Sequence, residues 1–440
     1  MTSSEPSRTV NRVIHPYTKM ALVAIAMLLI GLASHAAQAQ TFTVLHNFTN
    51  GADGSNPYSG VTIPQAGRLY GTTRSDSTGN GTVFRMTRQG SGWTFAPLFR
   101  FDGSNGTWPE ARVVFGPDGQ LYGTTEDGGG FGVLGVVYSL RPPAQACPSL
   151  FCEWGQSILA RLATASDGNF FDYGDLIFDP DDNIYGTVET GGSTCIGGPG
   201  GGSGPEGNVY QLTKSGQSWT KKIIYNFENP SAGAQPTSGV IRDAAGNLYG
   251  TTEACGDPQC NHGGTVFELT SQQGTCWSEQ TLHAFAVDGS EGRAPIAGLV
   301  ADGAGNMYGA TIAKGPNGGG TIFELSPSQG GWSFQVLYAL SGSGYTPGPW
   351  RNLALDAAGN LYGTTYSEGA FGYGSIFKLT QENGSWTYTS LHDFSGGNDG
   401  GYPLSNVSMD ANGNLFGTAS AGGSSTNCAG GCGVVWEVTP

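Results

Sequence analysis

The stretch Asp243-Ala-Ala-Gly-Asn-Leu-Tyr-Gly-Thr-Thr-Glu253 joins a turn sequence to a short apolar strand pattern, and versions of it recur along the whole chain. Its aromatic-Gly pair occurs seven times, at intervals of 52–64 residues. The aromatic positions are Tyr70, Tyr122, Tyr185, Tyr249, Tyr308, Tyr362 and Phe416. A repeat of this length that is built from strand-like pieces is typical of a propeller.

Each repeat contains four strand patterns, which are clearest in the fourth copy at residues 238–243, 248–252, 264–270 and 277–285. Turn residues separate them, and no window of comparable quality has the helical period. The sequence therefore predicts an all-β fold, a seven-bladed β-propeller with four antiparallel strands per blade.

The last repeat has no outer strand of its own at the C-terminal end. Residues 41–48 (Thr-Phe-Thr-Val-Leu-His-Asn-Phe) match the outer-strand pattern at 386–394. We therefore expect an N-terminal outer strand to complete the C-terminal blade, which would leave no unpaired edge between blades.

Residues 1–39 do not fit the repeat. Three basic side chains precede an apolar run at 20–33, and Ala37-Gln-Ala39 supplies small residues for cleavage. The run is short for a membrane span, so we expect a removed secretory signal peptide, no membrane span afterwards, and a secreted or periplasmic protein. Residues 40–440 are then predicted to form a single propeller.

The charge of the mature chain excludes one class of partner. Without residues 1–39, 16 Lys and Arg remain against 33 Asp and Glu, a formal net charge of −17. Such a surface repels phosphate backbones, so we expect no nucleic acid partner. We expect a monomer.

Residues that recur in most blades are predicted to be framework. The turn Asp residues accept backbone amides, the Gly after each Tyr is expected near the axis where sheets crowd, and six Trp residues begin outer strands. His46, His283 and His392 share one outer-strand position and have the same interpretation.

Cysteines form three local pairs in an exported chain, which favours disulfides at Cys147–Cys152, Cys255–Cys260 and Cys428–Cys432. Cys195 and Cys276 are expected on opposite faces, about 17 Å apart, too far to pair with each other. We expect both to stay unpaired unless Cys195 reaches Cys255 or Cys260.

The units at 247–252 (Asn-Leu-Tyr-Gly-Thr-Thr) and 264–270 (Gly-Thr-Val-Phe-Glu-Leu-Thr) resemble those of the GloVer (Gloeo/Verruco) tandem-repeat family of exported bacterial proteins. The resemblance covers nearly all of 41–440. It implies a secreted or cell-envelope repeat protein whose unit has no assigned catalytic motif.

Residues that differ between blades at one location are the candidates for function. The second-to-third loops and the starts of the inner strands should lie on one face, beside the channel mouth. The candidates there for ligand binding are Tyr58, Arg74, Glu110, Arg112, Glu126, Tyr173, Asp175, Glu189, Glu253, Trp350, Arg351 and Tyr366. Carboxylates, guanidiniums and aromatic rings that converge in this way suit a polar ligand.

Three functions follow from this pattern. The first is a non-catalytic exported propeller that binds a polar ligand, a glycan or a protein at the channel mouth. The second is a propeller hydrolase, lactonase or lyase that uses Glu126, Glu189 and Glu253, with calcium as its one conceivable cofactor. The third is a structural cell-envelope protein. Mutual repulsion of the three Glu residues must be relieved by arginine, by a cation or by protonation.

Overall fold

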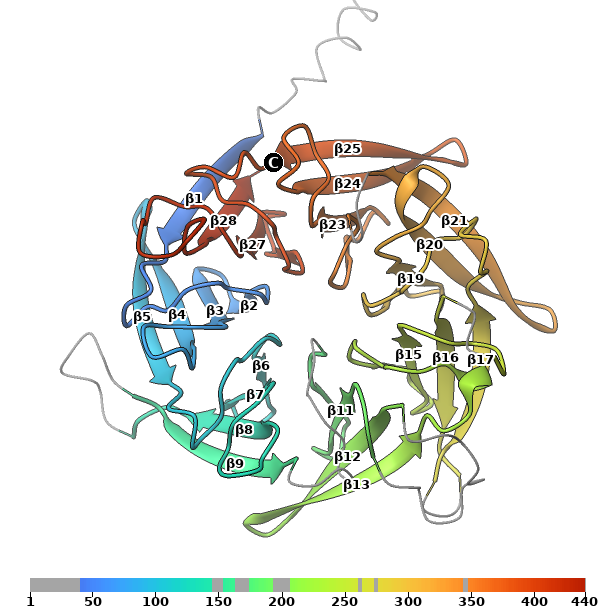
Figure 1. Cartoon of the computed structure of the whole chain (residues 1–440), viewed down its shortest axis with the longest axis horizontal. Helices are drawn as coiled ribbons and strands as arrows, with labels where there is room; N and C mark the ends of the chain where they lie inside the picture. The colour runs from blue at the N-terminus through green and yellow to red at the C-terminus, as the bar shows by residue number, and fades with distance from the viewer. Residues whose placement is uncertain are drawn as a thin grey trace, which may run out of the picture. The chain divides into compact units, whose positions relative to one another are not determined.

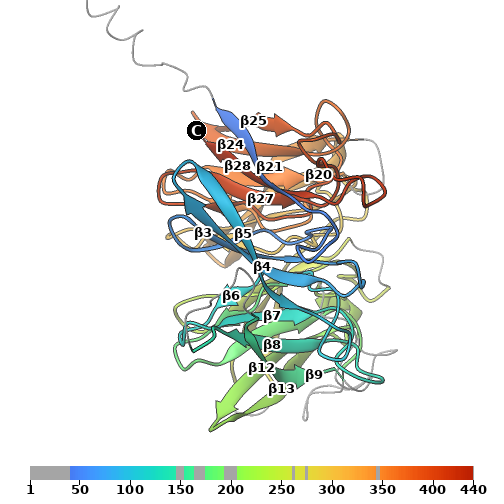
Figure 2. The same cartoon turned by 90° about the vertical axis from the view of Figure 1, so that its left-hand side faces the viewer.

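The computed structural model describes residues 40–144, 153–162, 174–192, 206–259, 263–272, 276–342 and 347–439. Within these ranges, 28 strands form seven four-stranded sheets arranged around a common centre (Figure 1). Figure 2 shows adjacent sheets from the side, with the labelled strands of the first blade above those of the second. Phe42–Thr439 form one compact unit. The predicted all-β seven-bladed propeller is confirmed.

In each of the first four blades the strands follow one another in the chain from the inner strand outward. Blade 1 is β2 (Thr62–Gln65), β3 (Arg68–Thr73), β4 (Thr82–Gln89) and β5 (Gly92–Arg100); blade 2 is β6 (Val114–Phe115), β7 (Leu121–Thr125), β8 (Val136–Arg141) and β9 (Gly155–Arg161); blade 3 is β10 (Ile177–Phe178), β11 (Ile184–Val188), β12 (Asn208–Ser215) and β13 (Ser218–Asn226); blade 4 is β14 (Ile241–Arg242), β15 (Leu248–Thr252), β16 (Thr265–Thr270) and β17 (Ser278–Ala284).

The remaining blades follow the same order. Blade 5 is β18 (Val300–Ala301), β19 (Met307–Ala310), β20 (Gly318–Ser328) and β21 (Gly331–Ser341); blade 6 is β22 (Ala354–Leu355), β23 (Leu361–Thr365), β24 (Ser375–Glu382) and β25 (Ser385–Asp393); blade 7 is β26 (Ser408–Met409), β27 (Leu415–Ala419), β28 (Val434–Thr439) and β1 (Thr41–Asn47). A short 3-10 helix, η1 (Pro230–Ala232), lies between blades 3 and 4 in the chain.

The two ends of the propeller meet in blade 7, where β1 lies beside β28 (Figure 1). Immediately after β1, the amide of Phe48 donates to the carbonyl oxygen of Gly433 at 3.1 Å, and the Phe48 ring is completely buried. The prediction that an N-terminal outer strand completes the last blade is therefore confirmed.

The repeated Asp-to-Tyr segment forms a hydrogen-bonded unit in blade 4. Asp243 Oδ1 accepts the amide of Asn247 at 2.8 Å, while its Oδ2 accepts the Asn247 side-chain amide and the Tyr249 hydroxyl. Asp179, Asp302 and Asp356 accept the corresponding three bonds in their own blades. The turn Asp thus fixes the Tyr of the second strand, as its framework interpretation requires.

Glycine is needed after each second-strand aromatic residue for a different reason from the one expected. Gly250 pairs with Phe267 of the adjacent strand, and a Cβ on Gly250 would lie 2.6 Å from the Phe267 ring. The third-strand residue opposite the glycine is aromatic in all seven blades. Its ring lies across the glycine, so the obstacle is the ring of the same blade rather than crowding at the axis.

The outer-strand tryptophans join adjacent blades. Trp93, Trp154, Trp219, Trp277, Trp332 and Trp386 each pack edge-on against the second-strand aromatic residue of the preceding blade, with ring centroids 5.9–6.5 Å apart. Edge-to-face pairs at such distances stabilise beyond their buried area. The framework role predicted for these six residues agrees with this packing.

The inner strands are shorter than the sequence suggested. In blade 4 the strand covers only Ile241–Arg242 instead of residues 238–243. Gly239 instead lies against the backbone of Asp175 in blade 3, where an added Cβ would be 2.5 Å from the Asp175 carbonyl oxygen. This part of the chain packs against the neighbouring blade, so it does not extend the pairing of its own sheet.

The Cys428–Cys432 disulfide is present as predicted. Cys255 and Cys276 are also disulfide-bonded, whereas Cys147, Cys152, Cys195 and Cys260 lie outside the described residues. The expectation that Cys276 stays unpaired, which rested on the placement of the loops on opposite faces, is wrong. No helix in the described part of the chain is long and apolar enough to cross a membrane.

Candidate functional site

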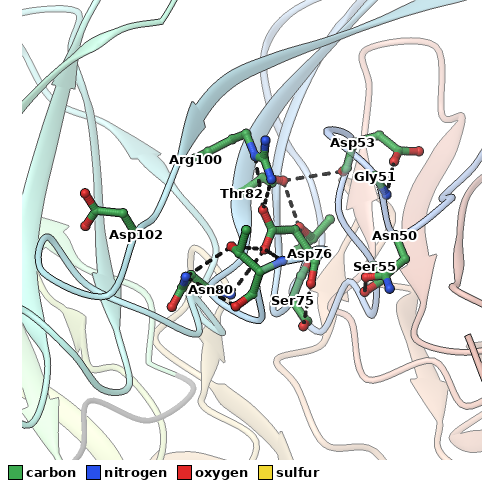
Figure 3. A network of polar contacts seen from close by, with 12 residues as sticks. Asn50, Gly51, Asp53, Ser55, Ser75, Asp76, Asn80, Thr82, Arg100 and Asp102 are labelled. Atoms are coloured by element: carbon green, nitrogen blue, oxygen red, sulfur yellow. Dashed lines mark hydrogen bonds and ion pairs between the residues drawn. The ribbon is translucent and has the colours of Figure 1, made fainter.

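The candidate site begins at the loop that follows β3. Asp76, whose side chain is buried, accepts both Nε and Nη2 of Arg100, at 3.0 and 2.6 Å, and the backbone amides of Thr78 and Asn80 (Figure 3). Although burial raises it, these hydrogen bonds hold the pKa of Asp76 below its ordinary value. The loop that starts at Arg74 is therefore held by an ionised carboxylate.

The residue before the inner-strand proline adopts a left-handed backbone in five blades: Asn56, Trp108, Gln235, Ala294 and Tyr402, with φ of 52–59°. In each case its carbonyl oxygen accepts the amide of the residue four positions after the second-strand aromatic residue, as in the bond from Glu126 to Trp108 at 2.9 Å. These two positions are therefore neighbours in every such blade. Left-handed non-glycine residues are uncommon and tend to collect at functional sites.

In blade 1 and blade 2 these positions bring three ionisable groups together. Arg74 forms an ion pair with Glu110 through Nε, and its Nη2 lies 3.5 Å from Glu126 Oε2. The Glu110 side chain is only 3% exposed. Burial and the carboxylate of Glu110 raise the pKa of Glu126 to about 8, against the opposing charge of Arg74. At neutral pH, Glu126 is therefore a neutral hydrogen-bond donor beside an Arg–carboxylate pair.

Two aromatic rings enclose the Arg74 guanidinium. Its carbon lies 4.5 Å from the Trp108 ring centre and 5.5 Å from that of Tyr58, both within cation–π range. The Trp108 indole donates to the carbonyl oxygen of Gly79 at 2.9 Å, which ties the ring to the loop held by Asp76. We call Tyr58, Arg74, Trp108, Glu110 and Glu126 the Arg74 surface.

A second aromatic group borders this surface from blades 6 and 7. Tyr366 lies 5.7 Å from Trp350 and 5.0 Å from Tyr402, measured between ring centres. Burial raises the pKa of Tyr58, and the nearby Tyr366 adds to this shift. The Arg74 surface and this second aromatic group are therefore neighbours. The partly exposed aromatic residues are Tyr58, Trp350, Tyr366 and Tyr402.

Arg112 and Asp175, predicted for the same face, connect blades 2 and 3. Arg112 donates from its amide and its Nε to Asp175 at 3.1 and 3.0 Å, and its Nη2 lies 2.8 Å from the same carboxylate. Blade 7 joins them, because Asn406 donates to Asp175 at 3.4 Å and Ser408 accepts from Arg112 at 3.3 Å. The donors of Arg112 are thus used inside the protein.

Arg351 lies further from solvent than a ligand-contacting arginine would. It is 6% exposed, and it donates to the carbonyl oxygens of Leu404 and Glu110, both at 3.0 Å. The second bond links blade 6 to blade 2, 241 positions earlier in the sequence. These contacts of Arg351 connect blades across the propeller and fix the backbone of Glu110.

The other predicted acids form a separate group. Burial and the charge of Glu189 raise the pKa of Glu253, which places these two residues near each other in blades 3 and 4. The charge next to Glu126 is Glu110 rather than Glu189. Tyr173 lies outside the described residues. Within the described ranges, no group of three or more His, Cys, Asp or Glu side chains is arranged to hold a metal ion.

Two residues of the site were missed in the sequence, Trp108 and Tyr402. Both directly precede an inner-strand proline, so the proline repeat could have marked them. The left-handed conformation that turns them towards the second-to-third loops is not encoded in a recognisable residue type, because Asn, Trp, Gln, Ala and Tyr occupy the same position.

The chain therefore combines a closed seven-bladed propeller with a partly exposed surface of aromatic, arginine and carboxyl side chains at one end of its inner strands. Its sequence matches the model of the Gloeobacter/Verrucomicrobia repeat over residues 32–199, 157–348 and 259–440. These overlapping regions span most of the sequence, so the chain belongs to the Gloeobacter/Verrucomicrobia repeat family, in agreement with the resemblance noted above. None of the curated proteins matches it in sequence.

Solved structures with the same fold are distant in sequence. An ancestral GH74 enzyme has a TM-score of 0.54 and 13% identity, with 88% of this chain and 48% of that chain covered. The extracellular domain of a hybrid two-component system from B. thetaiotaomicron has a TM-score of 0.50 and 12% identity, covering 89% and 39%. A gluconolactonase from Xanthomonas campestris has a TM-score of 0.40 and 12% identity, covering 92% of both chains. At such identities the likeness to the first two structures shows the fold alone.

Proposed function

We propose that this chain is an exported, non-catalytic propeller that binds a glycan at the Arg74 surface. The observation that carries the proposal is the enclosure of the partly exposed Arg74 guanidinium by two aromatic rings and two carboxyl groups. Ligand sites commonly combine aromatic walls with a few fixed polar groups.

The chemistry of these groups suits hydroxyl-rich ligands. Sugar rings present C–H faces that pack on aromatic rings, and Tyr58, Trp350 and Tyr366 are partly exposed for this purpose. A neutral Glu126 donates one hydrogen bond and accepts others, which suits a hydroxyl better than it suits a charged group.

The disulfides support the proposed export. Cys428–Cys432, Cys255 and Cys276 are all bonded, and disulfides persist in oxidising compartments. The apolar run in residues 20–33 behind three basic residues supplies a signal of the secretory type.

A second candidate is a hydrolase that uses Glu126 as a general acid. Its support is the raised pKa of Glu126 beside the buried Glu110, since environments that separate two acids assign acid and base roles. Against it, Glu110 is nearly inaccessible and is bound to Arg74. Binding without turnover is therefore the better interpretation.

The test is calorimetric titration with soluble oligosaccharides of several linkage types. We expect at least one series to bind the native protein, and Tyr366→Leu to weaken binding about tenfold or more, because the ring is lost. Tyr366→Phe keeps the ring and serves as the matched control. Chromatography of the incubated ligand should show no cleavage; product formation that Glu126→Gln abolishes would establish the hydrolase instead.

A further inference from the structure

A cavity of about 600 Å³ lies between blades 5 and 6, and its lining includes no residue of the Arg74 surface. Tyr338, Leu340 and Gly342 line it from β21 and the residues that follow, while the loop after β23 and the strand β25 supply the other side. The size is within the range of small-molecule sites. Nothing in the proposed glycan site uses these residues.

Glu368, in the loop after β23, is the unusual residue of this cavity. It lines the cavity but is only 8% exposed, and its Oε1 has no hydrogen-bond partner. Burial raises its pKa to about 8. A buried carboxyl group without partners is costly, so most such groups in folded proteins are bonded or act in a site.

The carboxyl group is also held in place. An added Cβ on Gly319 would lie 2.7 Å from Oε1, and one on Gly342 would lie 3.3 Å from it. Glycine at both positions therefore leaves the space that the carboxyl group occupies. Neither backbone offers Oε1 a hydrogen bond, so the packing fixes the group without satisfying it.

A second acid and two rings complete the lining. Asp393 accepts the Ser390 hydroxyl at 2.9 Å at the end of β25. Tyr388 stacks on Tyr338 with ring centres 5.0 Å apart, and both Glu368 and Asp393 raise the pKa of Tyr388 together with burial. The lining residues that the structure describes include two acids and two tyrosines but no Lys, Arg or His.

We propose that this cavity binds a small organic cation, an alkylammonium or guanidinium group, with Glu368 as its counter-charge. The absence of basic side chains from the described lining disfavours anionic ligands. A cation supplies the donors that Glu368 lacks, and the tyrosine rings suit its alkyl portion and its charge.

Binding of a cation next to Glu368 should be linked to the release of a proton. The cation favours the ionised carboxylate, so binding near neutral pH must release the proton of Glu368. The other titratable groups that line the cavity are Asp393, Tyr338 and Tyr388. Burial raises the pKa of Tyr388 further above neutrality, so Tyr388 does not supply this proton.

The test is titration calorimetry with agmatine, which carries both an ammonium and a guanidinium group, in buffers with different ionisation enthalpies. We expect saturable binding with release of up to one proton at pH 7 and higher affinity at pH 8.5. Glu368→Gln, which is nearly isosteric, should lower the affinity at least tenfold and remove the proton release. Glu126→Gln, at the Arg74 surface, should change neither.

Several outcomes would overturn the proposal: no binding of agmatine, equal binding of 1,4-butanediol, or displacement of agmatine by CaCl₂ at low millimolar concentration. Undiminished affinity in a folded Glu368→Gln variant would also do so. Proton release is measured on the native protein, so a folding defect in the variant leaves the test intact. Oligosaccharide binding at the Arg74 surface is scored separately, so either proposal can fail alone.

Discussion

At the scale of single residues, the site depends on how burial changes acid chemistry. Glu126 keeps its proton to about pH 8 because it is desolvated beside Glu110, and Arg74 only partly opposes this. Glu110 itself remains next to the guanidinium. Burial therefore raises the pKa of a carboxyl group that lies beside an arginine, and the sequence alone does not reveal this effect.

Glu126→Gln should change the pH dependence of stability in a defined direction. The pKa of Glu126 is higher in the folded protein than its ordinary value of 4.5, so the folded state binds more protons between about pH 4.5 and 8. Native stability therefore falls as pH rises through this window, by up to about 1.4 kcal/mol per pH unit from this group, and Gln removes that fall. Urea unfolding at pH 5, 6.5 and 8 measures it.

The matched control is Glu382→Gln, which changes an exposed acid in the β24–β25 hairpin. Its unfolding free energy should follow that of the native protein at every pH. If Glu126→Gln also gives a curve parallel to the native one, Glu126 is ionised in the folded protein and its proposed donor role is wrong.

At the scale of elements, the sequence predicted the strands better than their contacts. The four patterns of each repeat, the Asp-based turns and the outer-strand tryptophans were all recognisable because each repeat shows them again. The contact of Gly250 with Phe267 was not, because the residues opposite each other across two strands depend on register. The same limit applied to the segments before the shortened inner strands, such as Gly239 of blade 4, which packs on blade 3.

The pairing of Gly250 with Phe267 predicts a strong mutual dependence. Gly250→Ala should cost about 1–3 kcal/mol of unfolding free energy, because its Cβ overlaps the ring. In a Phe267→Leu background the added cost should be clearly smaller, since the overlap is relieved. Denaturant unfolding of the two single variants and the double variant gives the coupling.

Gly303→Ala is the control for this cycle. Gly303 has open space around it, and blade 4 already has Ala244 at the equivalent turn position. We expect a change within about 0.5 kcal/mol. Additive costs of Gly250→Ala and Phe267→Leu would show that the ring does not lie over the glycine.

At the scale of the whole molecule, closure repeats the contact that joins ordinary blades. His283 of blade 4 stacks on Phe334 of blade 5, with ring centres 3.7 Å apart. The N-terminal strand β1 makes the same stacking contact on both of its sides. The Phe42 ring stacks on His392 of blade 6, with ring centres 3.6 Å apart, and the His46 ring stacks on Phe95 of blade 1, with ring centres 4.2 Å apart. The ring therefore has equivalent outer-strand contacts on both sides of its closing strand.

Contacts across the ring explain why the site was only partly predictable. The repeat placed Arg74, Glu126 and Tyr366 on one face, since each follows a second strand. The bonds of Arg351 to the Glu110 backbone and of Asn406 to Asp175 join segments more than 200 residues apart. They exist only after closure, so no local pattern reports them.

Because β1 closes the propeller, a change at the residue that directly follows it should affect the stability of the entire propeller. Phe48→Ala should lower the free energy of unfolding by about 3–5 kcal/mol, since the Phe48 side chain is completely buried among residues of blades 1 and 7. Thr43→Ala, at an exposed position within β1, should stay within about 0.5 kcal/mol of the native protein. Unfolding followed by tryptophan fluorescence and by far-UV circular dichroism should give coincident single transitions, shifted together in Phe48→Ala. If only a small early phase shifts while the main transition keeps its midpoint, β1 is a local attachment and the blades hold the ring closed without it.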